Sequence, residues 1–273
     1  MEVTTTETTT TASTLRQEWD TWHAAREKEL GTPHGWLSLT ALEWITGTPQ
    51  RFDGVPGTWR ATGDGGVELT APAAEGLVAA GKPVEGTVRL EPRDGLPGAL
   101  VTAGDRKIEV VRRTDTYALR VRDPQAPTRT AFTGVPAFPV DARWVVEARF
   151  TPYPEPRRIT VGAVVEGLNH FPTAVGTVRF TLDGTEHELV ALAGKPDGLS
   201  LHFRDATSGR TTYGGGRMLR VGAPAADGTL TLDLNRVVNL PCVFTAFATC
   251  PLPPEGNTLS VAVEAGEKLP ASP

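Results

Sequence analysis

The first periodic pattern of apolar residues along the chain is helical. From residue 15 to about residue 30, apolar side chains recur every three or four positions and include Trp19 and Trp22, which is the spacing of one face of an α-helix. Gly31 and Pro33 then interrupt the pattern, as residues that end helices do. We predict one amphipathic helix whose two tryptophans pack against a sheet.

Beyond the helix, short apolar runs separated by turn residues predict a series of strands. Turn-forming pairs such as Asp64-Gly65 and Asp94-Gly95 stand between the runs. Regular spacing of short strands is typical of a β sandwich or meander. The predicted strands of this first series are residues 57–61, 67–70, 84–90, 99–102, 107–113 and 116–121.

A second series of strands follows a link rich in proline and alanine, residues 124–139. Its clearest hairpin turns at Asp183-Gly184, and Val178, Phe180 and Leu182 alternate before the turn and so share one face. The predicted strands of this series are residues 144–150, 158–166, 176–182, 186–193, 199–204, 218–221 and 230–234.

We therefore predict a mainly β protein with an N-terminal helix. A β sandwich-like subdomain is followed by an antiparallel barrel-like subdomain, which a Pro-rich C-terminal hook closes. The high content of turn residues, 29 Gly and 23 Pro, agrees with many strands and loops. The expected parts are a disordered Thr-rich tail over 1–14, the helix with the first β subdomain over 15–135, and the second β subdomain with the hook over 136–273.

The net charge indicates which classes of partner to expect, and the N-terminal sequence indicates the cellular compartment. The net charge is −5 and no run of Lys or Arg is long enough to follow a phosphate backbone, so nucleic acid is not an expected partner. The first 14 residues lack the basic start and apolar core of a secretory signal, and no apolar run has the length of a membrane span. We expect a cytoplasmic protein without membrane contact, and its oligomeric state stays open.

The densest grouping of polar and aromatic residues lies near the C-terminus, where Asp233, Asn235 and Arg236 follow a predicted strand. Arg217 comes directly after three glycines, which let backbone approach a ligand or a neighbouring strand closely. A carboxylate, an amide and guanidinium groups together bind a polar or anionic molecule, or they satisfy one another as a structural network. Both interpretations stay open.

From this grouping we predict a small-molecule-binding protein whose pocket lies in the second subdomain. The alternative is a cofactor-independent enzyme, such as a cyclase, isomerase or hydrolase, that uses acid-base chemistry in the same pocket. No cofactor is expected, and no metal, since none of the five histidines stands at metal-ligand spacing from another. The candidate catalytic residues are Asp233 and Tyr213, and the candidate ligand-binding residues are Arg217, Asn235, Arg236, Asn239, Cys242, Phe244, Phe247 and Cys250.

The two cysteines, Cys242 and Cys250, are eight positions apart. This separation is too wide for a zinc knuckle, and no second thiol pair completes a four-thiolate site. A reducing compartment disfavours a permanent disulfide, so our leading expectation is two buried free thiols. A disulfide that closes the hook, a metal ligand and a nucleophilic thiolate are the alternatives.

The C-terminal motifs resemble those of the family called domain of unknown function 1684. Similar stretches include Phe203-Arg204-Asp205-Ala206-Thr207, Tyr213-Gly214-Gly215-Gly216-Arg217 and Ala248-Thr249-Cys250-Pro251-Leu252-Pro253-Pro254. The chain departs from the family pattern at Val237-Val238-Asn239-Leu240 and at Phe247, where the family pattern has tyrosines. The resemblance implies no activity. If relatives use either phenol as a proton donor, this chain lacks that step, which favours binding or altered catalysis.

Overall fold

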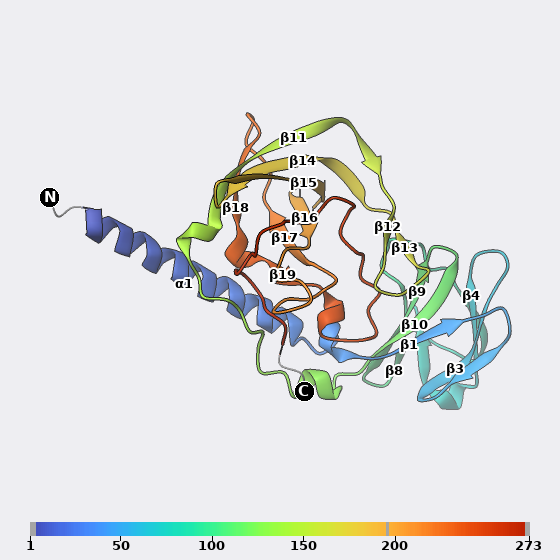
Figure 1. Cartoon of the computed structure of the whole chain (residues 1–273). Coiled ribbons are helices and arrows are strands. Elements are labelled where there is room, and N and C mark those ends of the chain that lie inside the picture. The colour runs from blue at the N-terminus through green and yellow to red at the C-terminus, as the bar shows by residue number, and fades with distance from the viewer. Residues whose placement is uncertain (1–3, 195–196, 271–273) are drawn as a thin grey trace.

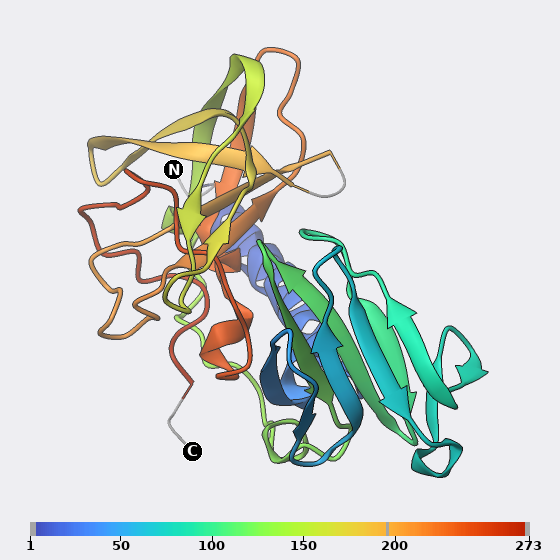
Figure 2. The same ribbon diagram turned by 90° about the vertical axis from the view of Figure 1, so that its right-hand side faces the viewer.

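The structure, a computed structural model, describes residues 4–194 and 197–270. It is mainly β, and its N-terminal helix, α1 (Thr4–Leu30), lies beside two β lobes (Figures 1 and 2). The helix ends at the predicted place but begins at Thr4, so the tail predicted as disordered is helical from there on. Neither glycine nor proline occurs before Gly31, and nothing in the chain therefore breaks the helix earlier.

The first lobe packs two antiparallel sheets face to face, as the sandwich-like prediction requires. One sheet has the strand order β1-β10-β9-β8-β5-β6 and the other β2-β3-β4-β7. Trp59, Leu69, Ile108 and Leu119 are among the core residues between them. The strands are β1 (Leu39–Ile45), β2 (Gln50–Phe52), β3 (Val55–Ala61), β4 (Val67–Ala71), β5 (Leu77–Ala79), β6 (Lys82–Pro83), β7 (Gly86–Leu90), β8 (Ala99–Ala103), β9 (Arg106–Arg113) and β10 (Thr116–Arg122).

The second lobe is one seven-stranded antiparallel sheet that curls into half a barrel (Figure 1). Its strand order is β18-β11-β14-β15-β16-β17-β19, and β12 and β13 form a separate pair. The strands are β11 (Val145–Arg158), β12 (Val161–Gly162), β13 (Asn169–His170), β14 (Thr173–Leu182), β15 (Thr185–Ala193), β16 (Leu199–Phe203), β17 (Arg217–Val221), β18 (Thr229–Asp233) and β19 (Val238–Asn239).

The hairpin predicted at Asp183-Gly184 is confirmed. Leu182 pairs with Thr185, and both turn residues have positive φ, 49° at Asp183 and 76° at Gly184, which is the conformation of a tight type I′ turn. Val178, Phe180 and Leu182 all lie in the core of this lobe. The predicted face of β14 is therefore the buried one.

Short helical elements connect these parts. The 3-10 helix η1 (Trp36–Ser38) leads from α1 into β1, and α2 (Pro127–Thr130) lies in the link between the lobes. Three further 3-10 turns are η3 (Ala142–Trp144), η4 (Leu234–Arg236) and η5 (Pro241–Val243), and η2 (Ala73–Glu75) lies in the first lobe.

The C-terminal segment fills the concave side of the curled sheet. Leu259, Val263 and Ala265 are buried in the same core as β14 to β18. The alternation of Val261 and Val263 resembles that of a strand, but the segment forms only isolated bridges, Thr258 with Arg204 and Glu267 with Ala137. Its main-chain groups are bound instead by polar side chains of the sheet, which are described below.

Helix α1 packs across the second lobe and is joined to it by side-chain hydrogen bonds. The Trp19 indole donates to the main-chain oxygen of Asn235 at 2.7 Å, and Arg26 donates to the main-chain oxygen of Asn239 at 3.0 Å. The predicted packing of Trp19 against the sheet lobe is thus confirmed. Within the described residues, no helix combines the length and apolar character that crossing a membrane needs.

Candidate functional site

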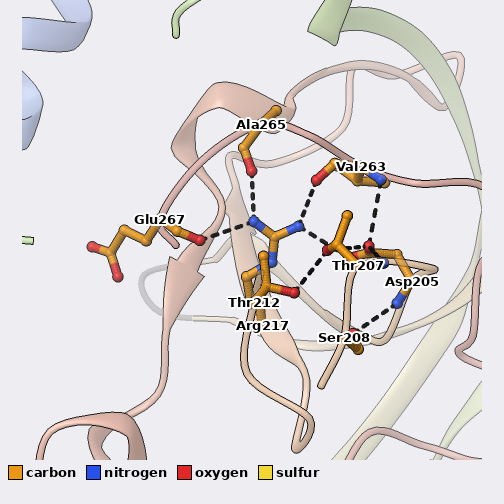
Figure 3. Close-up of polar contacts among 8 residues, drawn as sticks. All are labelled: Asp205, Thr207, Ser208, Thr212, Arg217, Val263, Ala265 and Glu267. Carbon is orange, nitrogen blue, oxygen red and sulfur yellow. Dashed lines mark hydrogen bonds and ion pairs between the residues drawn. The ribbon is translucent and has the colours of Figure 1, made fainter. Parts of the chain in front are cut away.

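Arg217, one of the predicted ligand-binding residues, is completely buried and bound by the protein itself. Its guanidinium donates to the main-chain oxygens of Ala265 (2.6 Å), Glu267 (3.0 Å) and Val263 (2.8 Å), and it pairs with the Asp205 carboxylate at 3.0 Å (Figure 3). Burial lowers the pKa of Arg217 against the opposing effect of Asp205. Arg217 therefore fastens the C-terminal segment to β17.

Asp205 in turn organises the loop that precedes β17. Its Oδ1 accepts hydrogen bonds from the main chain of Thr207 at 2.7 Å and from that of Val263 at 3.4 Å. The Thr207 hydroxyl binds both Asp205 and the Thr212 hydroxyl, and all three side chains are buried (Figure 3). Each charge in this cluster has a partner, as buried charges require.

Asp233, Asn235 and Arg236 form a second polar network at the end of β18. Asp233 Oδ1 accepts from the Asn235 amide at 2.9 Å, and Asp233 Oδ2 pairs with Arg236 at 3.0 Å. The Asn235 side chain also binds both main-chain groups of Asp141, at 3.1 and 3.0 Å. These contacts hold η4 against the link between the lobes, so most of the polar atoms serve the fold.

Asn239 links this region to the C-terminus and leaves one polar atom unused. Its main-chain N–H donates to Glu267 Oε2 at 2.6 Å, and its Nδ2 donates to the main-chain oxygen of Lys268 at 2.8 Å. Glu267 also pairs with Arg26 at 3.1 Å, and burial raises the pKa of this carboxyl. Asn239 Oδ1 is buried without a hydrogen-bond partner among the described residues.

Two adjoining hollows of about 300 and 290 Å³ lie between α1 and strands β17 and β19. We call them together the α1 groove. Both are lined by Arg26, Glu29, Arg220 and Val238. Further lining residues are Trp22, Ala25, Leu30, Thr32, His34, Gly35, Trp36, Arg122, Met218, Arg236, Asn239, Leu240 and Pro241.

The charges around the α1 groove are predominantly positive. Four arginines line it against one carboxylate, that of Glu29. Three of the arginines are paired outside the groove: Arg26 with Glu267, Arg122 with Glu109, and Arg236 with Asp233. Arg220 is exposed, and within the described part of the chain no hydrogen bond or ion pair involves its side chain. Its donors are therefore available to a ligand.

Comparison with known proteins places the chain in a family. Residues 130–268, just over half of the sequence, match the family model described as protein of unknown function, DUF1684. The chain belongs to DUF1684. A solved structure from Haloarcula marismortui, titled as an uncharacterized protein and determined by solution NMR, is 34% identical, and the similarity covers 51% of this chain and 78% of that one with a TM-score of 0.43. No curated protein matches.

The two cysteines of this DUF1684 protein form a disulfide, which corrects our leading expectation of free thiols. Cys242 and Cys250 are bonded with their Cα atoms 6.1 Å apart. The bond closes a loop, residues 242–250, that we call the hook loop. Sequence spacing did not decide between the alternatives because a disulfide requires a short Cα–Cα distance, which depends on the path of the chain in space. As bonded sulfurs, the two residues offer no thiolate to a ligand.

The remaining predicted site residues lie apart from one another. Tyr213 packs its ring against Gly215, where a Cβ would overlap it, and no hydrogen bond joins Tyr213 to Asp233 among the described residues. Phe244 packs against Leu30, Leu37 and Val135. Phe247 is half-buried in the hook loop. Of the predicted set, only Arg236 and Asn239 line the α1 groove.

The sequence analysis did not identify Arg220 and Arg26, two of the residues that make the α1 groove of this DUF1684 chain positively charged. A usable signal was present in β17, where Arg217 and Leu219 alternate with Met218 and Arg220. The first pair is buried and the second faces the groove. The contribution of α1 was not accessible in this way, because it depends on the packing of a helix from the far end of the sequence.

Two other kinds of site, a second surface hollow and a metal site, are less well supported. A larger hollow, about 1120 Å³, is an open surface over β11, β14 and β18, and its Arg179 already pairs with Glu188 across the strands. Among the described residues, no three His, Cys, Asp or Glu side chains gather closely enough to hold a metal ion.

Proposed function

We propose that this protein binds a small organic monoanion, a carboxylate attached to an apolar portion, in the α1 groove. The observation that carries the proposal is Arg220, whose guanidinium has no partner among the described residues and lies beside apolar lining residues. An arginine fork matches a carboxylate in shape and charge. One unpaired cation favours a ligand with a single negative charge.

The walls of the groove suit the rest of such a ligand. Trp22 lines one of the two hollows, and Trp36 and Met218 line the other. Binding sites for small molecules are typically apolar with a few convergent polar groups. Buried Asn239 lines the groove, and no described residue donates a hydrogen bond to its Oδ1. A hydroxyl or N–H group on the ligand would satisfy this atom, since a buried acceptor without a partner is costly.

Binding is better supported than the alternative of an acid-base enzyme. Acid-base chemistry needs a titratable group that reaches the substrate. Glu267, the buried carboxyl whose pKa is raised, does not line the groove and is engaged by Arg26 and Asn239. Glu29 does line it but is exposed on α1, and the ring of His34, which also lines it, is engaged by the main-chain oxygen of Asp105 at 2.8 Å. The groove is thus equipped to hold an anion rather than to exchange protons with it.

The test compares sodium octanoate with octanol as probes in thermal unfolding. Octanoate is expected to raise the melting temperature of the wild-type protein, since a ligand that binds the folded state stabilises it, whereas octanol has no such effect. Arg220→Gln is expected to abolish the shift. Arg210→Gln, which removes another exposed arginine of the same lobe, keeps it. An octanoate shift of the same size in Arg220→Gln, or no shift in the wild type, overturns the proposal.

A further inference from the structure

A second group of cations lies on the face of the first lobe that the hook loop covers, and it shares only Arg122 with the lining of the α1 groove. Arg113 of β9 pairs in register with Thr116 of β10, and residues two apart along β10 share a face. Arg113, Arg120 and Arg122 therefore project to one side of the sheet, together with Glu109, which is opposite Arg120. Thr249 of the hook loop contacts this side.

Two of these arginines meet at one neutral oxygen. Arg120 Nη2 donates to the Thr249 hydroxyl at 2.9 Å, and Arg113 Nε donates to the same oxygen at 3.4 Å. Thr249 is fixed from its other side, since its main-chain oxygen contacts His170 Nε2 at 2.5 Å. A hydroxyl thus occupies the position between two guanidinium groups where an anion is the natural partner.

Arg120 is the more unusual of the two because it is only 3% exposed. Its Nε is buried without a hydrogen bond. The nearby carboxylate of Glu109 pairs with Arg122 instead, at 3.0 Å. Within the described residues, neither Arg113 nor Arg120 has an ion pair. A buried charge without a counterion is strongly destabilising, and Arg217, which has Asp205, shows how this fold otherwise treats a buried arginine.

The surroundings keep Arg120 charged without neutralising it. Burial, and after it the charge of Arg113, lowers the pKa of Arg120 to about 10, so the group is still protonated at neutral pH. The guanidinium lies 5.5 Å from the centroid of the Trp36 ring, and Arg122 lies 5.2 Å from the same ring. An aromatic face attracts a cation, but it supplies no formal negative charge.

We infer that Arg113, Arg120 and Thr249 form a binding site for a dianionic phosphoryl group between the sheet face and the hook loop. The carboxylate of Glu109, and for Arg113 also that of Asp94, acts on these guanidinium groups without forming an ion pair with either. A phosphate, which carries close to two negative charges near neutral pH, supplies the direct partner that both lack among the described residues. Arg113 Nη2 and Arg120 Nη1 make no hydrogen bond to any described residue. These donors remain for the phosphoryl oxygens. Arg113 is half-buried, so the ligand enters from its side.

The test titrates inorganic phosphate into the full-length protein by calorimetry at constant ionic strength. Arg113→Gln is expected to weaken phosphate binding by about tenfold to a hundredfold, the effect of losing a charged hydrogen-bonding partner. Arg112→Gln is the matched control, because Arg112 is the neighbour on β9 that faces the opposite side and lies over Tyr117. It keeps wild-type affinity. No saturable binding to the wild type, or equal affinity in Arg113→Gln, overturns the inference.

A second variant and a second probe sharpen the result. Arg120→Met removes the unpaired buried charge, so it is expected to unfold at the same or a higher temperature than the wild type in phosphate-free buffer and to lose the stabilisation by phosphate. If it fails to fold, Arg113→Gln decides alone.

Phenyl phosphate binding more tightly than phosphate identifies a phosphorylated metabolite as the ligand, and the reverse identifies the free ion. Arg220→Gln keeps phosphate binding, which separates this site from the α1 groove.

Discussion

Arg217 and Asp205 form an ion pair of 3.0 Å in which neither side chain is more than 1% exposed. The pair lies where the C-terminal segment enters the half-barrel, and three further hydrogen bonds from Arg217 hold that segment. Removing one partner of a buried ion pair strongly lowers the stability of a protein, because the other partner then remains as an isolated buried charge.

Asp205→Asn is therefore expected to destabilise the protein strongly. The change keeps the shape of the side chain but leaves the Arg217 guanidinium without a counterion, at a cost of about 3–5 kcal/mol in unfolding free energy. Urea unfolding measures the change. Glu188→Gln is the matched control because it neutralises the exposed pair with Arg179 in the same sheet, and we expect little change from it. Equal effects of the two variants would show that burial does not decide the importance of the pair.

His202 predicts how stability depends on pH. It is 2% exposed, and burial lowers its pKa to about 4 from an ordinary value of 6.5. Between these values the unfolded chain binds a proton that the folded protein does not, so stability is complete above pH 6.5 and falls as the pH is lowered towards 4. The loss amounts to about 3 kcal/mol at the lower end.

The variant His202→Gln separates this histidine from the other titrating groups. It is expected to flatten the decrease in unfolding free energy between pH 6.5 and 4, whatever its effect at pH 7. Denaturant unfolding at a series of pH values gives the slope for both proteins. An unchanged slope in the variant would falsify the assignment of the acid sensitivity to His202.

The parts of the fold that depend on local patterns could be predicted from the sequence. The alternation around Asp183-Gly184 fixed both the hairpin and its buried face, since strand period and turn chemistry are local properties. Val261 and Val263 show the limit. Their alternation resembles a strand, but Val263 is bound by Arg217 and Asp205, which are distant in sequence. No local pattern reports such contacts.

The candidate site was less accessible to sequence reasoning for the same reason. Asp233, Asn235 and Arg236 were singled out as a polar group, and they do lie together. Whether such a group binds a ligand depends on what else reaches it, and Asp141 and helix α1 supply partners from far along the chain. Nothing in the sequence distinguishes Arg220 from the other arginines. It is a candidate binding residue because no described residue forms a hydrogen bond or an ion pair with its side chain.

Filling the α1 groove provides a prediction that does not alter its charges. Ala25 is exposed on α1 and lines the groove, whereas the adjacent Ala24 is exposed but does not line it. Ala25→Trp is expected to abolish the octanoate-dependent rise in melting temperature because the larger side chain occupies the hollow. Ala24→Trp carries the same cost in helix propensity, about 0.5 kcal/mol, and keeps the rise. Loss of the response in both variants would point to an effect on the helix rather than on the groove.

The disulfide between Cys242 and Cys250 gives the last prediction. It closes a short loop, with a sequence separation of 8, and constraining an unfolded loop of this size is worth about 2–3 kcal/mol in the chain-entropy account. Cys242→Ser with Cys250→Ser is therefore expected to lower the unfolding free energy by about this amount. Thiol titration of the unfolded wild-type protein should detect no free thiol before reduction and two after it. Two free thiols without reductant would return the cysteines to the buried, unpaired state that we first expected.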